Sequence, residues 1–337
     1  MPSNIYCTKV TNSVIDSVKK TLEISNYKKY IKEPIFLKVN LLSDQVVPGQ
    51  CTSPYVLEGV LQKLKQDGYK EIYCGDANVA TSNQVERAAK KWNHLEICEK
   101  YNVKFINLSK QDKIKINSKI FGNIGIPEIL KKVNSIITLP VLKTHNVSKF
   151  TCALKNQWGC LPEVRHRYHL ILDKCIPEIN NILKPNFVLV DATVCMEGSG
   201  PRTGKPRIMN AIFASNDLVS MDSFCSDLIG VGEVDYVLNA EKIGLGSSKY
   251  NLLGDKIEKT KFEPALISNH PIVFLEMKLR KIPVLSWFLF KTPFFKIPAF
   301  FASKYNSFFW YYTKGKKYAG TIIKESKIYN EEFKELI

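Results

Sequence analysis

Short apolar runs alternate with longer periodic segments through the first third of the chain, and this alternation constrains the fold more than any other feature. The run PIFLKVN (34–40) leads through a loop rich in Gly, Pro, Ser and Thr to an amphipathic segment over 55–68 that ends at a glycine. The same order returns with an apolar run at 71–75, a periodic segment at 83–99 and another apolar run at 104–108. Strands that alternate with helices in this way build a parallel sheet joined by crossover helices.

The later segments extend this pattern. Period-two alternation over 113–126 predicts a hairpin or an edge addition to the sheet. Further elements are predicted as a short helix at 127–133, strands at 135–139, 186–192 and 210–215, and helices at 217–229 and 234–243. We therefore expect an α/β fold with a largely parallel sheet and helices on both faces, followed by a C-terminal aromatic and basic helical segment.

The character of the chain changes near residue 253, which predicts an α/β core domain over 1–253 and a C-terminal amphipathic, basic and aromatic extension over 254–337. Nine Lys and Arg residues and no Asp or Glu lie between 277 and 317, which is over half of the formal net charge of +16. The longest uncharged apolar run, 282–290, is far shorter than the roughly 20 residues of a membrane-spanning helix.

This basic and aromatic segment, residues 271–318, is predicted to bind an anionic membrane surface, with aromatic side chains inserted and lysines at the headgroups. Two alternatives stay open, in which the aromatic side chains complete the core or form the interface of a homo-oligomer. Nucleic-acid binding is not expected, because no module that places basic residues between stacking aromatics is recognisable.

Cysteine usage points to a reducing compartment. The nine cysteines are scattered singly, without a CxxC pair, so they form neither a disulfide framework nor an iron-sulfur or zinc ligand set. The first residues, MPSNIYCTKV, contain no apolar region of a signal peptide. We expect a cytoplasmic protein that associates peripherally with a membrane.

Polar, basic and Gly-rich stretches follow the predicted strands, at 38–52, 75–78, 143–169 and 197–207. Open α/β sheets build their sites from the loops beyond the carboxyl ends of the strands, so we expect one crevice lined by these loops. The excess of 48 Lys and Arg over 32 Asp and Glu favours an anionic ligand. The glycine-rich stretch lacks the ending of a P-loop and the pattern of a dinucleotide site, and no cofactor is identified.

The third of these loops contains the predicted catalytic residues. A lysine that is desolvated beside other cations loses proton affinity, and histidine titrates near neutral pH, so both suit proton transfer. The predicted set is Lys143, His145, Lys155, Asn156, His166 and His169. Lys155 and His145 are the first candidates for base or acid. As a secondary interpretation, His145, His166 and His169 are candidate ligands of a divalent metal.

The other loops supply the predicted substrate- and anion-binding residues, which are Lys38, Asn40, Thr52, Asp76, Gly200, Arg202 and Lys205. A lysine and an amide at a strand end hold an anionic oxygen, and free backbone N–H groups at the start of the next helix, 52–54, add to this. Glycines allow close approach of the backbone, and Arg202 and Lys205 supply positive charge. Asp76 is interpreted first as a turn or helix cap, and otherwise as a group that orients a base or binds a metal.

A set of short motifs resembles the DUF362 family, a domain of unknown function, over roughly residues 35–248. These motifs are KVN with TSP, YCGDAN, LPVLKTH with ALKNQWG, VDATVCMEGSGP with TGKP, SNDLVSMD and GLG. Many members carry an appended ferredoxin-like region with iron-sulfur cysteine motifs, which this chain lacks, so no cluster is expected.

The family is also distantly similar to the catalytic domain of lactate racemase, in which a Lys-containing loop and histidines hold a nickel-pincer cofactor. The corresponding segments here are the Lys155 loop and His145, His166 and His169. The His-rich signature that accompanies the nickel cofactor is absent from the first half of this sequence, so the cofactor is not carried over.

The residues therefore predict a membrane-associated α/β enzyme. Its basic crevice binds an anionic small molecule or lipid-linked substrate, bearing phosphate or carboxylate, for acid/base or redox chemistry. The alternative is a non-catalytic binding or scaffold protein of a membrane-associated assembly.

Overall fold

The computed structural model describes residues 2–79, 85–161, 165–266, 274, 278–282, 284–285, 287, 292, 294 and 296–337. The strands are β1 (Ser3–Lys9), β2 (Ile35–Lys38), β3 (Ile72–Asp76), β4 (Lys104–Asn107), β5 (Lys113–Ser118), β6 (Gly122–Pro127), β7 (Ser135–Thr138), β8 (Val141–His145), β9 (Lys149–Thr151), β10 (Phe187–Glu197), β11 (Lys205–Ser215) and β12 (Tyr250–Gly254).

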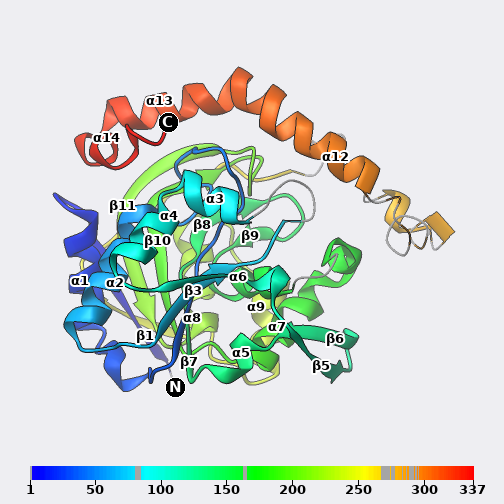
Figure 1. Cartoon of the computed structure of the whole chain (residues 1–337), viewed down its shortest axis with the longest axis horizontal. Helices are drawn as coiled ribbons and strands as arrows, with labels where there is room; N and C mark the ends of the chain where they lie inside the picture. The colour runs from blue at the N-terminus through cyan, green and yellow to red at the C-terminus, as the bar shows by residue number, and fades with distance from the viewer. Residues whose placement is uncertain are drawn as a thin grey trace.

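Helices surround these strands (Figure 1). The α-helices are α1 (Val14–Ile24), α2 (Pro54–Gln66), α3 (Val85–Lys91), α4 (His94–Lys100), α5 (Ile129–Lys132), α6 (Ala153–Asn156), α7 (Leu172–Leu183), α8 (Leu218–Leu228), α9 (Asp235–Lys242), α12 (Lys296–Lys304), α13 (Lys316–Glu325) and α14 (Lys327–Phe333). Short 3-10 helices are η1 (Tyr27–Lys29), η2 (Leu108–Lys110), η3 (Gln157–Cys160) and η4 (Arg165–Ile171), and η7 (Tyr305–Gly315) is a π-helix.

The main sheet has the strand order β12-β1-β11-β10-β7-β2-β3-β4. Its pairs from β10 through β7, β2 and β3 to β4 are parallel, as is the pair of β1 and β12, whereas β11 runs antiparallel to both of its neighbours. The predicted α/β class with a largely parallel sheet is confirmed. The antiparallel edge was not predicted, because it depends on pairing between distant parts of the chain.

The strand order changes direction at one place, between β2 and β7. From β2 the chain adds β3 and β4 on one side, and later adds β7 and β10 on the other side. In such sheets a crevice opens at the carboxyl ends of the two strands where the direction changes. The topology therefore places a binding site beyond the ends of β2 and β7.

The core lies on both faces of the sheet. Successive side chains of a strand point to opposite faces, and in β2 Phe36 packs into one hydrophobic cluster while Ile35 and Leu37 pack into the other. The first cluster includes side chains of α7, α8 and α9, and the second includes side chains of α1, α2 and α4. Helices thus cover both faces, as expected.

Three predicted elements differ from the structure. The helix expected over 83–99 is divided within its described part, 85–99, into α3 and α4, because Asn93 adopts a left-handed conformation with φ of 60°. Residues 83 and 84 lie outside the described residues. The strands expected over 186–192 and 210–215 form the start and the end of a longer antiparallel ribbon, β10–β11, whose outer part is Val194–Glu197 paired with Lys205–Ile208. The Gly- and Pro-rich stretch that was interpreted as a loop therefore lies partly in this ribbon.

The C-terminal helices form an arc over one end of the domain (Figure 1). Ile322 of α13 and Tyr329 and Phe333 of α14 are buried in the same cluster as α2, so the end of the described chain is part of the core. Trp310 of η7 is also buried. Among the helices that the structure describes, none combines the length and the hydropathy of a membrane-spanning segment.

Candidate functional site

A pocket of about 280 Å³ lies beyond the carboxyl ends of β2, β3 and β7, where the strand order changes direction. It collects side chains from all four predicted loops. The predicted residues that line it are Asn40, Asp76, Lys143, His145, Lys155, Asn156, His166, His169, Gly200 and Arg202. Lys38, Thr52 and Lys205 are not part of its lining.

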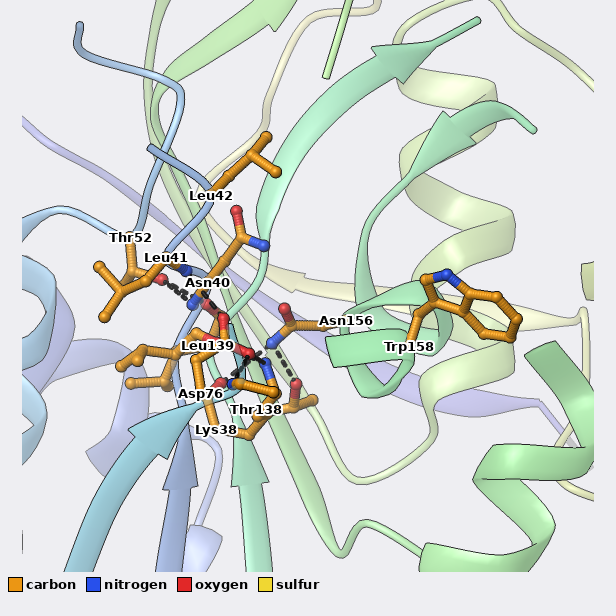
Figure 2. A network of polar contacts seen from close by, with 12 residues as sticks. Lys38, Asn40, Leu41, Leu42, Thr52, Asp76, Thr138, Leu139, Asn156 and Trp158 are labelled. Atoms are coloured by element: carbon orange, nitrogen blue, oxygen red, sulfur yellow. Dashed lines mark hydrogen bonds and ion pairs between the residues drawn. The ribbon is translucent and has the colours of Figure 1, made fainter. Parts of the chain in front are cut away.

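The floor beneath the pocket is a buried ion pair at the ends of β2 and β3. Lys38 Nζ lies 2.8 Å from Asp76 Oδ1 and donates a hydrogen bond to the carbonyl oxygen of Val39 at 2.7 Å. The other oxygen of Asp76 accepts from the backbone N–H of Leu41 at 2.9 Å (Figure 2). Lys38 is therefore engaged inside the protein, and it holds Asp76 rather than facing a ligand.

Asn156 and Thr52 fasten the surrounding loops to this floor (Figure 2). Asn156 Nδ2 donates to the carbonyl oxygen of Lys38 at 3.0 Å and to Thr138 Oγ1 at 2.7 Å, which joins α6 to β2 and β7. Thr52 Oγ1 accepts from the N–H of Asn40 at 2.8 Å and donates to the carbonyl oxygen of Leu139 at 2.7 Å. Thr52 thus shapes the loop of Asn40 from outside the pocket.

The start of α2 is not available to a ligand, contrary to the expectation for 52–54. The N–H of Ser53 donates to Asp191 Oδ2 at 2.8 Å, and the Ser53 hydroxyl donates to Glu332 of α14. The N–H of Val56 donates to Ser53 Oγ at 3.2 Å. Two buried carboxyl groups of the chain itself therefore occupy this helix terminus, and burial raises the pKa of Glu332 to about 8.

Two lysines face the pocket in different states. Lys143 Nζ donates to Asn40 Oδ1 at 2.6 Å and to the carbonyl oxygen of Gln50, and burial lowers its pKa to about 8. Burial, followed by the nearby charges of Lys143 and Arg165, lowers the pKa of Lys155 to about 7. Lys155 is therefore divided between the ammonium and the neutral amine at neutral pH.

The three pocket histidines are held in their neutral form. His145 Nδ1 accepts from the backbone N–H groups of Val147 at 3.0 Å and Ser148 at 3.3 Å, which places the proton of the neutral ring on Nε2. Burial and then the charge of Lys155 lower the pKa of His145 well below its usual value. The rings of His166 and His169 lie 4.8 Å apart, and burial lowers the pKa of His166 to about 3.

No metal centre emerges from these side chains. In the part of the chain that the structure describes, no group of three His, Cys, Asp or Glu side chains is placed to hold a metal ion. The secondary interpretation of His145, His166 and His169 as metal ligands therefore has no support in the described geometry.

Arg202 is the most unusual group in the pocket. Its side chain is only 7% exposed, and its Nε, Nη1 and Nη2 atoms are buried without a hydrogen-bond partner among the described residues. Its backbone carbonyl accepts from Gln50 Nε2 at 2.6 Å, which fixes the loop that carries it. Burial lowers the pKa of Arg202 to about 10, so the guanidinium stays charged at neutral pH.

Three residues that shape the site are missing from the predicted set. Asp222 accepts from the N–H groups of Ala153 at 2.6 Å and Leu154 at 3.0 Å, and so positions the helix that carries Lys155. Arg165 lines the pocket and donates to the carbonyl oxygen of Leu161 at 2.9 Å. Gly159 lies against the floor. Asp222 and Gly159 fall in the motifs SNDLVSMD and ALKNQWG, which was the signal available in the sequence.

We predict that Gly159→Ala destabilises the protein by about 3 kcal/mol, because the added methyl group meets a fixed ion pair. A Cβ at this position would lie 2.5 Å from Asp76 Oδ1 and 2.7 Å from Lys38 Nζ. Gly320 of α13 is the control, since nothing lies within 4 Å of a Cβ there and Gly320→Ala should stabilise the helix slightly. Urea denaturation measures both changes. Equal free energies of unfolding of the two variants would show that the ion pair of Lys38 and Asp76 is not held rigidly beneath Gly159.

The known proteins to which this chain is similar include one relative in sequence and two solved structures. A thylakoid-associated protein of Synechocystis sp. is 23% identical over 254 residues, which cover 71% of this chain and 78% of that protein. The lactate racemase apoprotein of Thermoanaerobacterium thermosaccharolyticum has a TM-score of 0.43 and 14% identity, and the match covers 69% of this chain and 58% of that structure. A protein of Thermotoga maritima has a TM-score of 0.36 and 13% identity, over 55% of this chain and 51% of that one.

The chain thus spans between half and three-fifths of the length of these two solved structures. The family model of the domain of unknown function DUF362 matches residues 35–227, which is more than half of the chain and agrees with the extent of the motifs. The chain therefore belongs to the DUF362 family.

Proposed function

We propose that the pocket binds a small carboxylate or phosphate and that Lys155 exchanges a proton with it. The observation that carries this proposal is the buried guanidinium of Arg202, whose three nitrogen atoms have no partner among the described residues. A buried donor without a partner costs about 1–3 kcal/mol, and more when it is charged. A carboxylate or phosphate oxygen pair matches the fork of a guanidinium and removes that cost.

The charges around Arg202 also favour an anion. Lys143, Lys155 and Arg165 line the same pocket, and Asp76 is the one carboxylate among the described lining residues. Asp76 is already paired with Lys38. Asp44 lies near Arg202 outside this lining and forms an ion pair with Arg87. An anion that enters the pocket therefore meets several positive groups and no carboxylate without an ion-pair partner, in surroundings where water screens charges weakly.

The proton-transfer part of the proposal depends on Lys155 and His145. A general acid or base is most effective when its pKa lies near the working pH, and the pKa of Lys155 is about 7. His145 is neutral and carries its proton on Nε2, so it serves as a hydrogen-bond donor to a ligand oxygen. Lys155 is thus assigned as the base or acid, and His145 as a donor that orients the substrate or stabilises developing negative charge.

We also propose that the exposed surface of the C-terminal arc binds peripherally to an anionic membrane. α12 and η7 turn large apolar side chains away from the domain, and these are Ile297, Phe300, Phe301, Phe308, Phe309 and Tyr312. The basic residues Lys304, Lys314, Lys316 and Lys317 are exposed on the same stretch. Helices of this kind lie in the interface of a bilayer. The first part of the predicted membrane-binding segment 271–318, up to residue 295, lies largely outside the described residues.

The name of the Synechocystis relative, a thylakoid-associated protein, is compatible with this location. If the pocket only recognised an acidic group and transferred no proton, the protein would be a binding or scaffold component on the same membrane. The ionisation of Lys155 bears on these two possibilities, because a permanently charged ammonium cannot accept a proton from the ligand.

Arg202→Leu should weaken the binding of inorganic phosphate or acetate by 10- to 100-fold, which corresponds to one charged hydrogen-bonding group of about 1.5–3 kcal/mol. The variant without ligand should be at least as stable as the natural protein, because an unpaired buried charge has been removed. Isothermal titration calorimetry measures the affinity. Lys205→Gln is the matched control, since it removes a positive charge from the same loop outside the pocket. Equal affinities of the two variants would contradict the assignment of Arg202.

Lys155 should react with acetic anhydride at a rate that rises through a midpoint near pH 7. Below this pH its amine is protonated and unreactive, and above it the neutral amine is available. Mass spectrometry of the labelled protein gives the midpoint, and Lys149 on the neighbouring β9 is the exposed control. Added phosphate should move the midpoint of Lys155 to higher pH, because an anion stabilises the ammonium. If the reaction rate of Lys155 does not rise through a midpoint near pH 7, Lys155 is not the base.

The protein should sediment with vesicles that contain an anionic phospholipid, and Phe301→Ser with Phe308→Ser and Phe309→Ser should abolish this, because three inserted aromatic side chains are lost. Lys316→Gln should weaken binding by about fivefold, or about 1 kcal/mol for one lysine near the surface. The control is Leu252→Ser, an exposed apolar residue on β12. Unchanged sedimentation of the triple variant would rule out insertion of this face.

A further inference from the structure

We infer that the ligand of the pocket is an amphiphile, with its anionic group at Arg202 and its apolar chain along the exposed aromatic face of α12 and η7. This inference rests on the proposed anion binding and adds the chemical class of the substrate. It follows from one feature, which is that a wall of the pocket and the exposed aromatic face both belong to the adjoining helices α12 and η7.

The pocket is closed on one side by this helix. Ala302, Tyr305 and Asn306 line the pocket together with the basic residues of the sheet loops. Tyr305 and Asn306 follow Ala302 by three and four positions, so all three lie on one side of the helix. The remaining lining includes apolar side chains, which are Leu41, Leu42, Val79, Val141, Val147 and Trp158. One end of the pocket is thus charged, while much of the rest offers apolar contacts to a hydrocarbon group.

Aromatic side chains continue from the pocket wall to the exposed surface. The ring of Tyr305 stacks on that of Phe309, with centroids 5.5 Å apart. The rings of Phe308 and Tyr312 form a second pair, with centroids 5.4 Å apart, and Phe308 is 73% exposed. These two ring pairs, the aromatic row, offer apolar surface, instead of water, to an alkyl chain that leaves the pocket.

The helix is fixed at the pocket rather than lying there loosely. Gln45, in the loop after β2, donates a hydrogen bond from Nε2 to the carbonyl oxygen of Ser307. The same loop contributes Asn40 and Leu42 to the pocket lining. Trp310, one turn further along, is buried. The loop that helps to form the anion site therefore also holds the aromatic row at its edge.

A free small anion leaves this arrangement unexplained. Such a ligand needs the charged end of the pocket only, whereas the exposed aromatic row carries an unfavourable contact with water unless it meets a bilayer or a hydrocarbon chain. An amphiphile held in a bilayer satisfies both ends, because its head group is anionic and its chain remains in the apolar layer in which the row is inserted.

The test is the binding of monoalkyl phosphates of increasing chain length to the full chain, below their micelle-forming concentrations and without vesicles. Each methylene removed from water strengthens association by about fourfold. Octyl phosphate should therefore bind at least about 60-fold more tightly than methyl phosphate, which is the effect of three buried methylenes. Calorimetry gives both affinities.

Variants identify where the chain lies. Phe308→Ser combined with Phe309→Ser should reduce the gain from methyl to octyl phosphate to a few-fold and leave the affinity for methyl phosphate unchanged. Leu252→Ser is the control and should retain the full gain. Arg202→Leu should weaken every member of the series by the same factor.

The outcomes separate the two proposals. If methyl phosphate binds through Arg202 and octyl phosphate binds no more tightly, the amphiphile is overturned and the anion site stands. If octyl phosphate binds equally well to Arg202→Leu, the chain adsorbs to the aromatic row without the pocket, and the inference is again overturned. If no phosphate of any length binds to the natural protein, the anion site itself is wrong and the inference fails with it.

Discussion

The buried ion pair of Lys38 and Asp76 is the interaction on which the rest of the site depends. Asp76 also accepts the backbone N–H of Leu41, and the carbonyl oxygen of Lys38 accepts from Asn156. This one ion pair thus fixes the relative positions of the ends of β2 and β3, the loop after β2, and helix α6, which carries Lys155. A buried pair adds little net stability, yet it is costly to break, so its effect is to select one arrangement of these segments. Gly159 belongs to the same constraint because no side chain fits over the pair.

The pocket above this ion pair contains several desolvated positive groups, which lower the free energy of unfolding of the protein. Desolvation in the pocket lowers the pKa values of Lys143 and Lys155, and the Arg202 side chain has no hydrogen-bond partner among the described residues. The two hydrophobic clusters on either face of the sheet provide the free energy that keeps these groups in place. Desolvated and unpaired charges of this kind are typical of functional sites, and a bound ligand removes their unfavourable energy.

The sequence was sufficient for the local parts of this arrangement. Strand β2, helix α2 and strand β3 were predicted within a few residues, since hydrophobic period and a terminal glycine are local signals. Because loops after parallel strands converge, the meeting of Asn40, His145 and Arg202 in one pocket was also predicted.

The direction of single side chains was not predictable. Lys38 and Thr52 turn toward Asp76 and the carbonyl oxygen of Leu139, and no pattern in the sequence connects these partners. Glu332 lies 279 positions from Ser53, so its place at the start of α2 depends on the completed fold. The same holds for the antiparallel pairing of β1 with β11, which joins the beginning of the described chain to its middle.

The unpartnered guanidinium of Arg202 also has a consequence for how long the protein survives. A ligand that binds only the folded state adds about 2.7 kcal/mol to stability at a concentration one hundred times its dissociation constant. Transiently unfolded chains are the ones that proteases remove, so a difference of this size changes abundance several-fold. Under the proposed anion binding, cells that lack the ligand would therefore degrade the empty protein faster, and its steady-state amount would follow the supply of the molecule that it binds.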